Sequence, residues 1–213
     1  MELSIVTTLY HSAPYLPEFY RRCCAAAEQL TADFEIIFVN DGSPDRSLEV
    51  ALELHERDAR VRIIDLSRNF GQHKAVMTGL AHARGRLVFL LDCDLEIKPE
   101  TLTQFLDKLH GEQADVVYGV QDTRADPWQD RLLGQAFYAV FNALSNDRLP
   151  PNLTMARLMS QRYVAALIAH QEREMLIGGL WVITGFKQIP LKIHKASKGS
   201  STYNLRRKAA LIV

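Results

Sequence analysis

Short apolar runs, separated by stretches of helical length, recur through the first 120 residues of the chain. Because the runs are rich in β-branched residues, they predict strands over Leu3–Thr8, Phe34–Val39, Val61–Leu66, Arg86–Leu91 and Ala114–Val120. Helices are predicted between them over Pro14–Leu30, Ser43–Asp58, His73–Ala83 and Pro99–His110. Pro14 lies near the first turn of the first helix, and Ser43 can cap the second. This alternation predicts right-handed βαβ units, and therefore an α/β fold with a Rossmann-like, mostly parallel central sheet flanked by helices.

The remainder of the chain has a less regular pattern. Trp128–Leu144 is rich in Phe and Tyr and predicts an amphipathic helix whose apolar side faces the core or, alternatively, lipid. Asn152–Met159 is expected to be an irregular or strand-like connector, and Ser160 to cap a helix that runs to about His170. One or two strands are expected within Gly178–Ile193, around Thr184 and Gly185.

Polar residues follow each of the first four predicted strands. The loops that leave these strands, here called exits, hold Tyr10, Asp41, Asn69 with its neighbour Arg68, and the acidic pair Asp92 and Asp94. Ligands of parallel α/β sheets bind outside the carboxyl ends of the strands, so we expect the four exits to face one crevice. Two carboxylates at this spacing suit Mg²⁺ or Mn²⁺, which leave other positions for water and substrate phosphates. The alternative is that the two acids only solvate a strand end and cap the helix near Pro99.

Composition and the absence of certain motifs restrict the function. At 213 residues and 47% hydrophobic, the chain can form one large domain with an ordinary core. We expect this domain over 1–193, in two parts over 1–120 and 121–193, followed by a basic tail over 194–213. No G-x-G-x-x-G follows the first strand and the chain contains no G-x-x-x-x-G-K-[ST], which disfavours dinucleotide-dependent dehydrogenases and P-loop enzymes. The three cysteines lack metal-ligand spacing and fit a reducing, cytosolic setting.

Charge is distributed unevenly along the chain. Residues 1–174 carry 18 basic and 25 acidic side chains, whereas residues 175–213 carry seven basic and no acidic ones. The basic tail indicates an anionic partner, either phosphates or an anionic membrane surface, unless it is simply solvated. No run of 18 apolar residues occurs, yet an apolar run begins after a basic cluster at Lys208–Val213. This fits either a natural end or a chain cut short before a membrane segment.

Six motifs together carry a resemblance to a known family. They are Ile5–Tyr10, Val39–Ser43, Leu66–Gly71, Asp92–Leu95, Ala156–Ser160 and Gly199–Tyr203. In order and spacing they resemble the inverting family 2 glycosyltransferases of the GT-A fold. The likeness is greater to the branch that transfers sugars to polyprenyl phosphates, such as dolichol-phosphate mannose synthases and bactoprenol glucosyltransferases. It extends over nearly the whole chain, and it implies a nucleotide-sugar-binding half over 1–120 and an acceptor-side half over 121–193. The tail motif commonly precedes membrane segments in that branch, which implies a juxtamembrane place for the tail over 194–213.

The resemblance implies roles for individual residues. Nucleotide-sugar contacts are implied for Thr8, Tyr10, Asp41, Asn69, Lys74, Asp92 and Cys93. Asp94, together with Asp92, would hold Mg²⁺ or Mn²⁺, and Asp94, Arg157 and Glu172 would be the catalytic residues. Arg157, Lys198 and Ser201 would face the diphosphate or an acceptor phosphate. Three of these residues also have plain structural interpretations: Asp41 as a helix cap, Lys74 as a solvated helix residue and Arg157 as a surface ion pair.

Two positions depart from the branch. Met155 stands where many members have an Asp, which removes a carboxylate that would help to bind metal or acceptor. In the tail, Thr202 replaces the usual Lys and Ala196 an upstream Arg, so Lys195 and Lys198 would have to supply the charge.

The implied reaction is metal-dependent transfer of a sugar, in cell-envelope polysaccharide synthesis, from a UDP-, GDP- or dTDP-linked donor to a polyprenyl phosphate or lipid-linked saccharide. An acceptor phosphate needs no general base, whereas a saccharide hydroxyl would need one. Glu172 or Glu174 could serve as this base. The alternative is that these two acids only form a charged helix end. We expect the enzyme to act at the cytoplasmic face of the membrane, either as a peripheral protein or anchored by a segment missing from this chain. No nucleic-acid partner is expected, and a homo-oligomer is left open. A sugar-phosphate nucleotidyltransferase and a non-catalytic nucleotide- or membrane-binding module are the alternatives from other classes.

Overall fold

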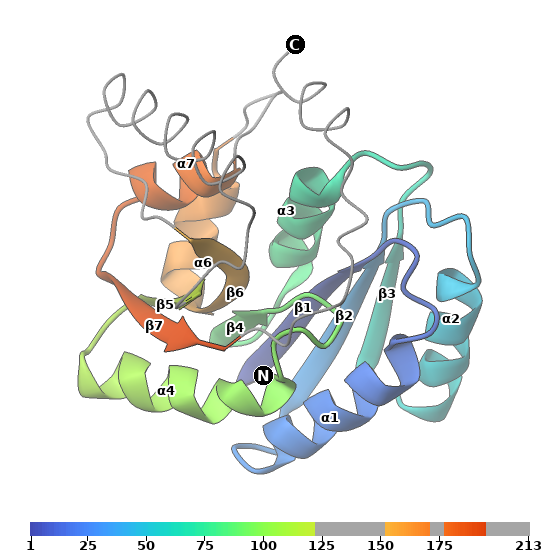
Figure 1. Cartoon of the computed structure of the whole chain (residues 1–213), viewed down its shortest axis with the longest axis horizontal. Coiled ribbons are helices and arrows are strands. Elements are labelled where there is room, and N and C mark those ends of the chain that lie inside the picture. The colour runs from blue at the N-terminus through green and yellow to red at the C-terminus, as the bar shows by residue number, and fades with distance from the viewer. Residues whose placement is uncertain (122–151, 171–176, 195–213) are drawn as a thin grey trace.

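A seven-stranded sheet forms the centre of the molecule. The computed structural model describes residues 1–121, 152–170 and 177–194 (Figure 1). The strand order is β3-β2-β1-β4-β6-β5-β7. The strands are β1 (Leu3–Leu9), β2 (Phe34–Asn40), β3 (Val61–Asp65), β4 (Leu87–Leu90), β5 (Val116–Gln121), β6 (Leu153–Ser160) and β7 (Gln188–Ile193). Only β6 among them runs antiparallel to its neighbours. The predicted α/β fold with a mostly parallel sheet is thus confirmed.

Helices cover both faces of this sheet. They are α1 (Leu16–Glu28), α2 (Ser47–Arg57), α3 (Gln72–His82), the short 3₁₀ helix η1 (Pro99–Thr101), α4 (Leu102–Gly111), α6 (Gln161–Ile168) and α7 (Ile177–Ile183). The buried side chains form two clusters: one joins the sheet to α1, α2 and α4, and the other joins it to α3, α6 and α7. The central strands are apolar on both sides because both of their faces are covered in this way.

The second half of the chain departs from the sequence prediction at two places. Asn152–Met159, expected to be an irregular or strand-like connector, forms most of β6, which is an inner strand of the sheet between β4 and β5. The segment before Thr184 is the helix α7 rather than a strand, because Ile177, Leu180 and Trp181 recur at helical spacing and are all buried. Only β7 remains of the two strands that were considered there. The helix expected over 128–144 lies outside the described residues.

The two predicted helix caps have different outcomes. Ser160 caps α6 as predicted, since its side chain accepts a hydrogen bond from the backbone N–H of Tyr163. Ser43 does not cap α2, which begins only at Ser47 and has no side-chain cap. In the described residues no helix is long and apolar enough to cross a membrane.

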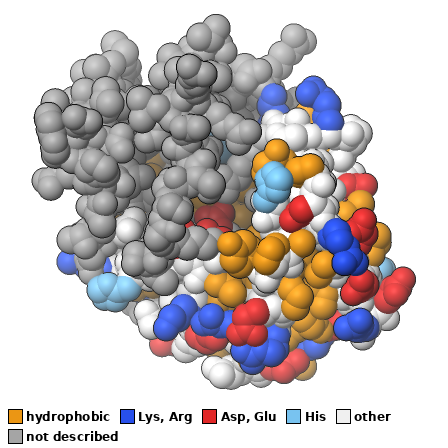
Figure 2. Space-filling view, turned by 45° about the vertical axis from the view of Figure 1, so that its right-hand side comes forward, with side chains coloured by type: hydrophobic (Ala, Val, Ile, Leu, Met, Phe, Trp, Pro, Cys, Tyr) orange, Lys and Arg blue, Asp and Glu red, His pale blue; other side chains and the backbone are white. Residues whose placement is uncertain are grey.

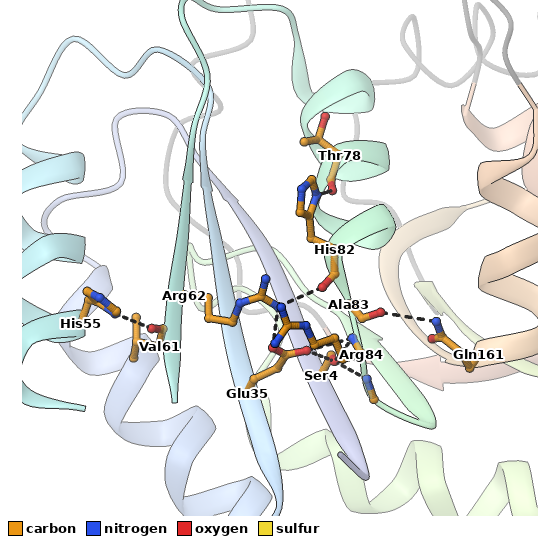
Figure 3. A network of polar contacts seen from close by, with 11 residues as sticks. Ser4, Glu35, His55, Val61, Arg62, Thr78, His82, Ala83, Arg84 and Gln161 are labelled. Carbon is orange, nitrogen blue, oxygen red and sulfur yellow. Dashed lines mark hydrogen bonds and ion pairs between the residues drawn. The ribbon is translucent and has the colours of Figure 1, made fainter. Parts of the chain in front are cut away.

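A buried carboxylate fixes the amino-terminal side of the sheet. Glu35 on β2 is 2% exposed and accepts hydrogen bonds from the Ser4 hydroxyl (2.7 Å), the Arg62 guanidinium (2.8 Å) and the backbone N–H of Arg84 (2.9 Å). Figure 3 shows these groups converging between β1, β2 and the turn that follows α3. A Cβ on the neighbouring Gly85 would come within 2.4 Å of the Ser4 backbone nitrogen, so this turn packs directly on β1. Glu35 therefore holds the α3–β4 connection against the sheet.

Replacing this carboxylate should destabilise the fold. Glu35→Ala would leave the buried Ser4 hydroxyl without its acceptor and the Arg62 guanidinium without its anionic partner, and we expect a loss of about 3 kcal/mol in the free energy of unfolding. Urea denaturation followed by circular dichroism measures this change. Glu18→Ala is the matched control, because Glu18 pairs with exposed Arg21 on the surface of α1. Equal stability of the two variants would contradict the assigned role of Glu35.

Candidate active site

The carboxyl ends of β1, β2, β3 and β4 lie at one edge of the sheet. The four strands are parallel, and their pairing continues beyond the last residues of β2 and β4. The backbone N–H of Asp41 donates to Leu9 O and that of Leu91 to Val6 O, both at 3.1 Å. The fold therefore brings the four polar exits to the same edge, as the sequence indicated.

Asp41 joins the exits of β2 and β3. Its side chain is 3% exposed and accepts hydrogen bonds from the backbone N–H groups of Phe70 (2.7 Å) and Gly71 (3.0 Å). The next residue, Gly42, has φ +58°, and a Cβ there would come within 2.4 Å of the Asn69 nitrogen. The two loops are thus in direct backbone contact, which only glycine permits. The interpretation of Asp41 as a helix cap is wrong, since α2 begins six residues later.

A second carboxylate, that of Asp45, joins the exits of β1 and β2. It accepts hydrogen bonds from the hydroxyls of Ser43 and Ser47 (both 2.5 Å) and from the backbone N–H of Ala13 (3.1 Å). The same two hydroxyls accept from the first loop in turn: Ser43 from the N–H of His11 (2.8 Å) and Ser47 from the N–H of Ser12 (2.9 Å). Partial burial disfavours the Asp45 anion, but these hydrogen bonds outweigh burial and lower the pKa of its carboxyl to about 2. Asp45 is therefore a stable anion that fixes both loops.

Two exposed aromatic residues flank Asp41. Tyr10 is 42% and Phe70 is 38% exposed. Tyr10 directly follows Leu9, whose carbonyl accepts the Asp41 N–H, and Phe70 donates its own N–H to the Asp41 carboxylate. The Arg68 guanidinium lies 4.4 Å from the centre of the Phe70 ring. Figure 2 shows a face of the molecule on which hydrophobic side chains gather at the surface among acidic and basic ones. Exposed aromatic rings beside a buried carboxylate can stack on a heterocyclic base and accept its N–H groups.

The loop after β4 presents its acids toward the edge of the sheet. Cys93 is buried in the core and its thiol donates to the Thr8 carbonyl at 3.7 Å. Burial raises the pKa of this thiol to about 11, so it stays neutral. The Cys93 side chain thus faces away from the edge, and a nucleotide contact implied for this residue could use only its backbone. Asp92 and Asp94, on either side of it, are both half-buried.

Hydrogen bonds from α3 and from within the loop itself orient the carboxylates of Asp92 and Asp94. Gln72 at the start of α3 donates to Asp92 Oδ1 (3.0 Å), and Asp94 Oδ1 accepts the N–H of Glu96 (3.0 Å). Leu95 has φ +63°, a conformation that costs a bulky residue about 1 kcal/mol or more, and its side chain packs on the core. Within the described residues no group of three or more His, Cys, Asp or Glu side chains could hold a metal. Two hard oxygen donors nevertheless fit Mg²⁺ or Mn²⁺, whose other ligands are commonly water and phosphate.

Arg157 is not a surface residue. Its side chain is 1% exposed, and the guanidinium carbon lies 3.0 Å from the centre of the Trp181 ring. Burial lowers the pKa of Arg157 to about 9. The interpretation as a surface ion pair is therefore wrong. Because Arg157 pairs with Leu90 on β4, it lies one strand away from the loop that carries Asp92 and Asp94.

The other predicted site residues fall into two groups. Thr8 and Asn69 lie at the same edge as Asp41, and Lys74 lies half-buried in the first turn of α3. Met155 stays on β6 and packs partly buried against the core. Glu172, Lys198 and Ser201 lie outside the described residues.

Three participants were missed by reasoning from the sequence: Asp45, Phe70 and Trp181. The alternation Ser43, Asp45, Ser47 was a detectable signal for the first of these, because hydroxyls on both sides of an acid are typical of a local hydrogen-bonded turn. No comparable local signal marks Phe70 or Trp181.

A doubly covered, mostly parallel sheet with an acidic loop at its carboxyl edge is the architecture of GT-A nucleotide-sugar-binding proteins. The family model described as Glycosyl transferase family 2 matches residues 4–164. A Mycobacterium tuberculosis protein (strain CDC 1551 / Oshkosh), named as a glycosyltransferase, is 52% identical over the whole of this chain and 62% of its own length. The uncharacterized glycosyltransferase YkcC of Bacillus subtilis is 30% identical over 97% of this chain and 65% of its own length. The chain belongs to glycosyl transferase family 2, and it spans less than two thirds of these relatives.

Solved structures confirm the fold. Glucosyl-3-phosphoglycerate synthase of M. tuberculosis, in complex with Mn²⁺, UDP and phosphoglyceric acid, superposes with a TM-score of 0.67, covering 99% of this chain and 74% of its own at 15% identity. The mannosyltransferase PcManGT of Pyrobaculum calidifontis, in complex with GDP-Man and Mn²⁺, gives a TM-score of 0.64 over 93% of this chain and 58% of its own, also at 15% identity.

The Asp45 network predicts a pH-dependent contribution to stability. The folded pKa of Asp45 lies below its ordinary value of 3.8, so the contribution is fully present above about pH 5 and is lost as the pH falls toward 2. We expect Asp45→Asn to lower the free energy of unfolding by about 2 kcal/mol at pH 7, and the difference from wild type to shrink between pH 4 and pH 2. Urea denaturation at several pH values tests this, with Asp107→Asn, at an exposed position of α4, as the control. A difference that does not change with pH would contradict the assignment.

Proposed function

We propose that this chain is the catalytic domain of an inverting, metal-dependent glycosyltransferase that uses a nucleotide sugar. The observation that carries the proposal is that Asp41, a buried carboxylate flanked by aromatic residues, lies at the same edge of the sheet as the acidic loop of Asp92 and Asp94. Membership of family 2 supports sugar transfer as the reaction class. Solved structures of the same fold contain UDP or GDP-Man together with Mn²⁺, which supports this kind of donor.

The nucleoside would lie over β1, β2 and β3. In this arrangement Tyr10 and Phe70 stack on the base, and Asp41, already fixed by two backbone N–H groups, accepts a hydrogen bond from it. Thr8, Asn69 and Lys74 lie around the same loops and would contact the ribose, the diphosphate or the sugar. Because Asp45 already fixes two of these loops in the absence of ligand, the conformational entropy that the loops would lose on binding is small.

The diphosphate would lie over β4. Asp94, with Asp92, would hold Mg²⁺ or Mn²⁺, and such an ion stabilises the negative charge of the leaving diphosphate. Asp92 is oriented by Gln72 and Asp94 by the backbone N–H of Glu96, so both donors are directed before the ion binds. The acceptor oxygen would then attack the anomeric carbon from the opposite side, with inversion of its configuration.

We propose a polyprenyl phosphate or lipid-linked saccharide at the cytoplasmic membrane surface as the acceptor, in cell-envelope polysaccharide synthesis. Sequence motifs carry this part: the Ala156–Ser160 segment and the basic tail with Lys198 and Ser201. A phosphate acceptor is already ionised at neutral pH and attacks without a base. A saccharide hydroxyl would require one, and Glu172 and Glu174 remain the candidates for that role.

Calorimetric titration tests the donor site. UDP, GDP and dTDP are each titrated into the protein with Mn²⁺ and again with EDTA. We expect one nucleotide to bind with a dissociation constant on the order of micromolar when the metal is present. Asp94→Ala should weaken this binding by about 100-fold. Asp107→Ala, an exposed aspartate on α4, is the matched control and should bind as wild type does.

Three results would count against the proposal. Binding that ignores EDTA, or that survives Asp94→Ala, would remove the metal site from the mechanism. Failure of all three nucleotides to bind would remove the donor site. Release of pyrophosphate instead of a nucleoside diphosphate on turnover would assign the chain to nucleotidyl transfer.

A further inference from the structure

Asn40 is the last residue of β2, and its side-chain amide is buried at the carboxyl edge of the sheet. The residue is 3% exposed. Its amide nitrogen donates to Asp65 Oδ1 at 2.7 Å, and its amide oxygen accepts the backbone N–H of Ser43 at 3.2 Å. Only this orientation of the amide suits both neighbours, because a carboxylate accepts and a backbone N–H donates. The Asn40 side chain therefore connects the end of β3 to the turn that follows β2.

This contact lies on the opposite face of the sheet from the Asp41 carboxylate. Phe38 on β2 packs in the buried cluster that includes α1 and α2, whereas Val39 packs in the cluster that includes α3. Side chains alternate along a strand, so Asn40 faces the same way as Phe38, and Asp41 the same way as Val39. Asp41 already fixes the exit of β3 by accepting two of its backbone N–H groups. The exits of β2 and β3 are thus joined on both faces of the sheet.

The hydrogen bonds of Asn40 continue to the exit of β1. The backbone carbonyl of Asn40 accepts the N–H of Leu66 at 3.0 Å, which extends the pairing of β2 with β3 by one residue. Ser43, whose N–H is held by the Asn40 amide, accepts the N–H of His11 with its hydroxyl. A continuous series of hydrogen bonds therefore begins at Asp65 and ends at His11. It crosses the ends of β3, β2 and β1, the three strands over which we place the nucleoside.

Asp65 is exposed at the end of an edge strand. A carboxylate that only solvates a strand end needs no buried partner, whereas loss of the Asp65 contact would leave a buried amide N–H without its acceptor. We propose that Asn40 and Asp65 are positioning residues for the nucleotide sugar, which hold the exits of β2 and β3 in the arrangement that binds the nucleoside. Neither side chain touches the nucleotide. The proposal rests on the function proposed above, because it assigns the pair to that binding site.

The pair would act by preorganising the two exits. Loops that are ordered before binding lose little conformational entropy when the ligand binds, whereas loops that move independently lose more, and the affinity falls. The two exits also fit closely, since a Cβ on Gly42 would come within 2.4 Å of the Asn69 nitrogen. A displacement of one exit relative to the other would therefore move Asp41 with respect to Asn69, and both are expected to contact the nucleotide sugar.

An exchange of the amide and the carboxylate tests the pair. Asn40→Asp keeps an acceptor for the Ser43 N–H but sets a second carboxylate against Asp65, and the two repel. UDP, GDP and dTDP are titrated calorimetrically with Mn²⁺, and we expect the dissociation constant of the nucleotide that binds wild type to rise about 20-fold. Asp65→Asn alone should stay within about threefold of wild type, because the new amide oxygen can still accept from Asn40. The double variant restores an amide–carboxylate pair with the groups exchanged, and we expect it to bind within about threefold of wild type.

Two further measurements separate positioning from stability alone. All titrations are made well below the melting temperature of each variant, so that a lower stability does not by itself weaken binding. Hydrogen exchange followed by mass spectrometry should show faster exchange over 40–47 and 61–71 in Asn40→Asp, and wild-type rates in the double variant. Gln104→Glu, at an exposed position of α4, is the matched amide-to-carboxylate control and should change neither binding nor exchange.

Each contrary outcome has a distinct meaning. Wild-type affinity in Asn40→Asp would overturn the positioning role, even if the two exits exchange faster, because the contact would then be structural only. A double variant that binds as weakly as Asn40→Asp would also overturn it, since the defect would not arise from the pair. In both cases wild type still binds its nucleotide, so the proposed function stands. If wild type binds none of the three nucleotides, the proposed function fails and the positioning role fails with it.

Discussion

Carboxylates that accept backbone N–H groups hold the carboxyl edge of this sheet together. Parallel strands end at a common edge, but their exit loops belong to segments far apart in the sequence and would otherwise be ordered separately. Asp41 fixes the third loop to the second, and Asp45 fixes the second to the first. Ionised acceptors make stronger hydrogen bonds than neutral ones, so a few side chains suffice to order a surface on which no regular secondary structure is available.

The first half of the fold could be predicted from the sequence because its strands are buried on both faces. Such strands read as continuous apolar runs, and the polar residues that end them mark the edge directly. The second half could not be read in this way. Arg157 interrupts the apolar pattern of β6, and the glycine pair of α7 resembles a turn, although Leu180 and Trp181 carry a helical spacing. In both elements tertiary contacts decide the structure against the local signal.

The candidate site was predictable at the positions that directly follow strands. The alternation of side chains between the two faces of a strand continues for four residues beyond β4. Leu91 and Cys93 therefore enter the core, while Asp92 and Asp94 face the other way. Contacts between loops were not predictable from local pattern. Ser43 was expected to cap a helix, yet its hydroxyl donates to Asp45 instead. The stacking of Arg157 on Trp181 exists only once α7 has packed on β6.

The reversed direction of β6 has a consequence for how specificity is encoded. Because β6 runs against its neighbours, the chain enters it at Leu153 beside Val120, the end of β5, at the same edge that the parallel strands leave. The loops of the first half and the start of β6 thus meet at one place although about 60 residues separate Asp92 from Leu153. Changes in one stretch of the gene need not disturb the other. A fold built in this way can change the residues around β6 while it keeps the loops that follow β1 to β4, so the two parts of the edge can acquire different ligand contacts.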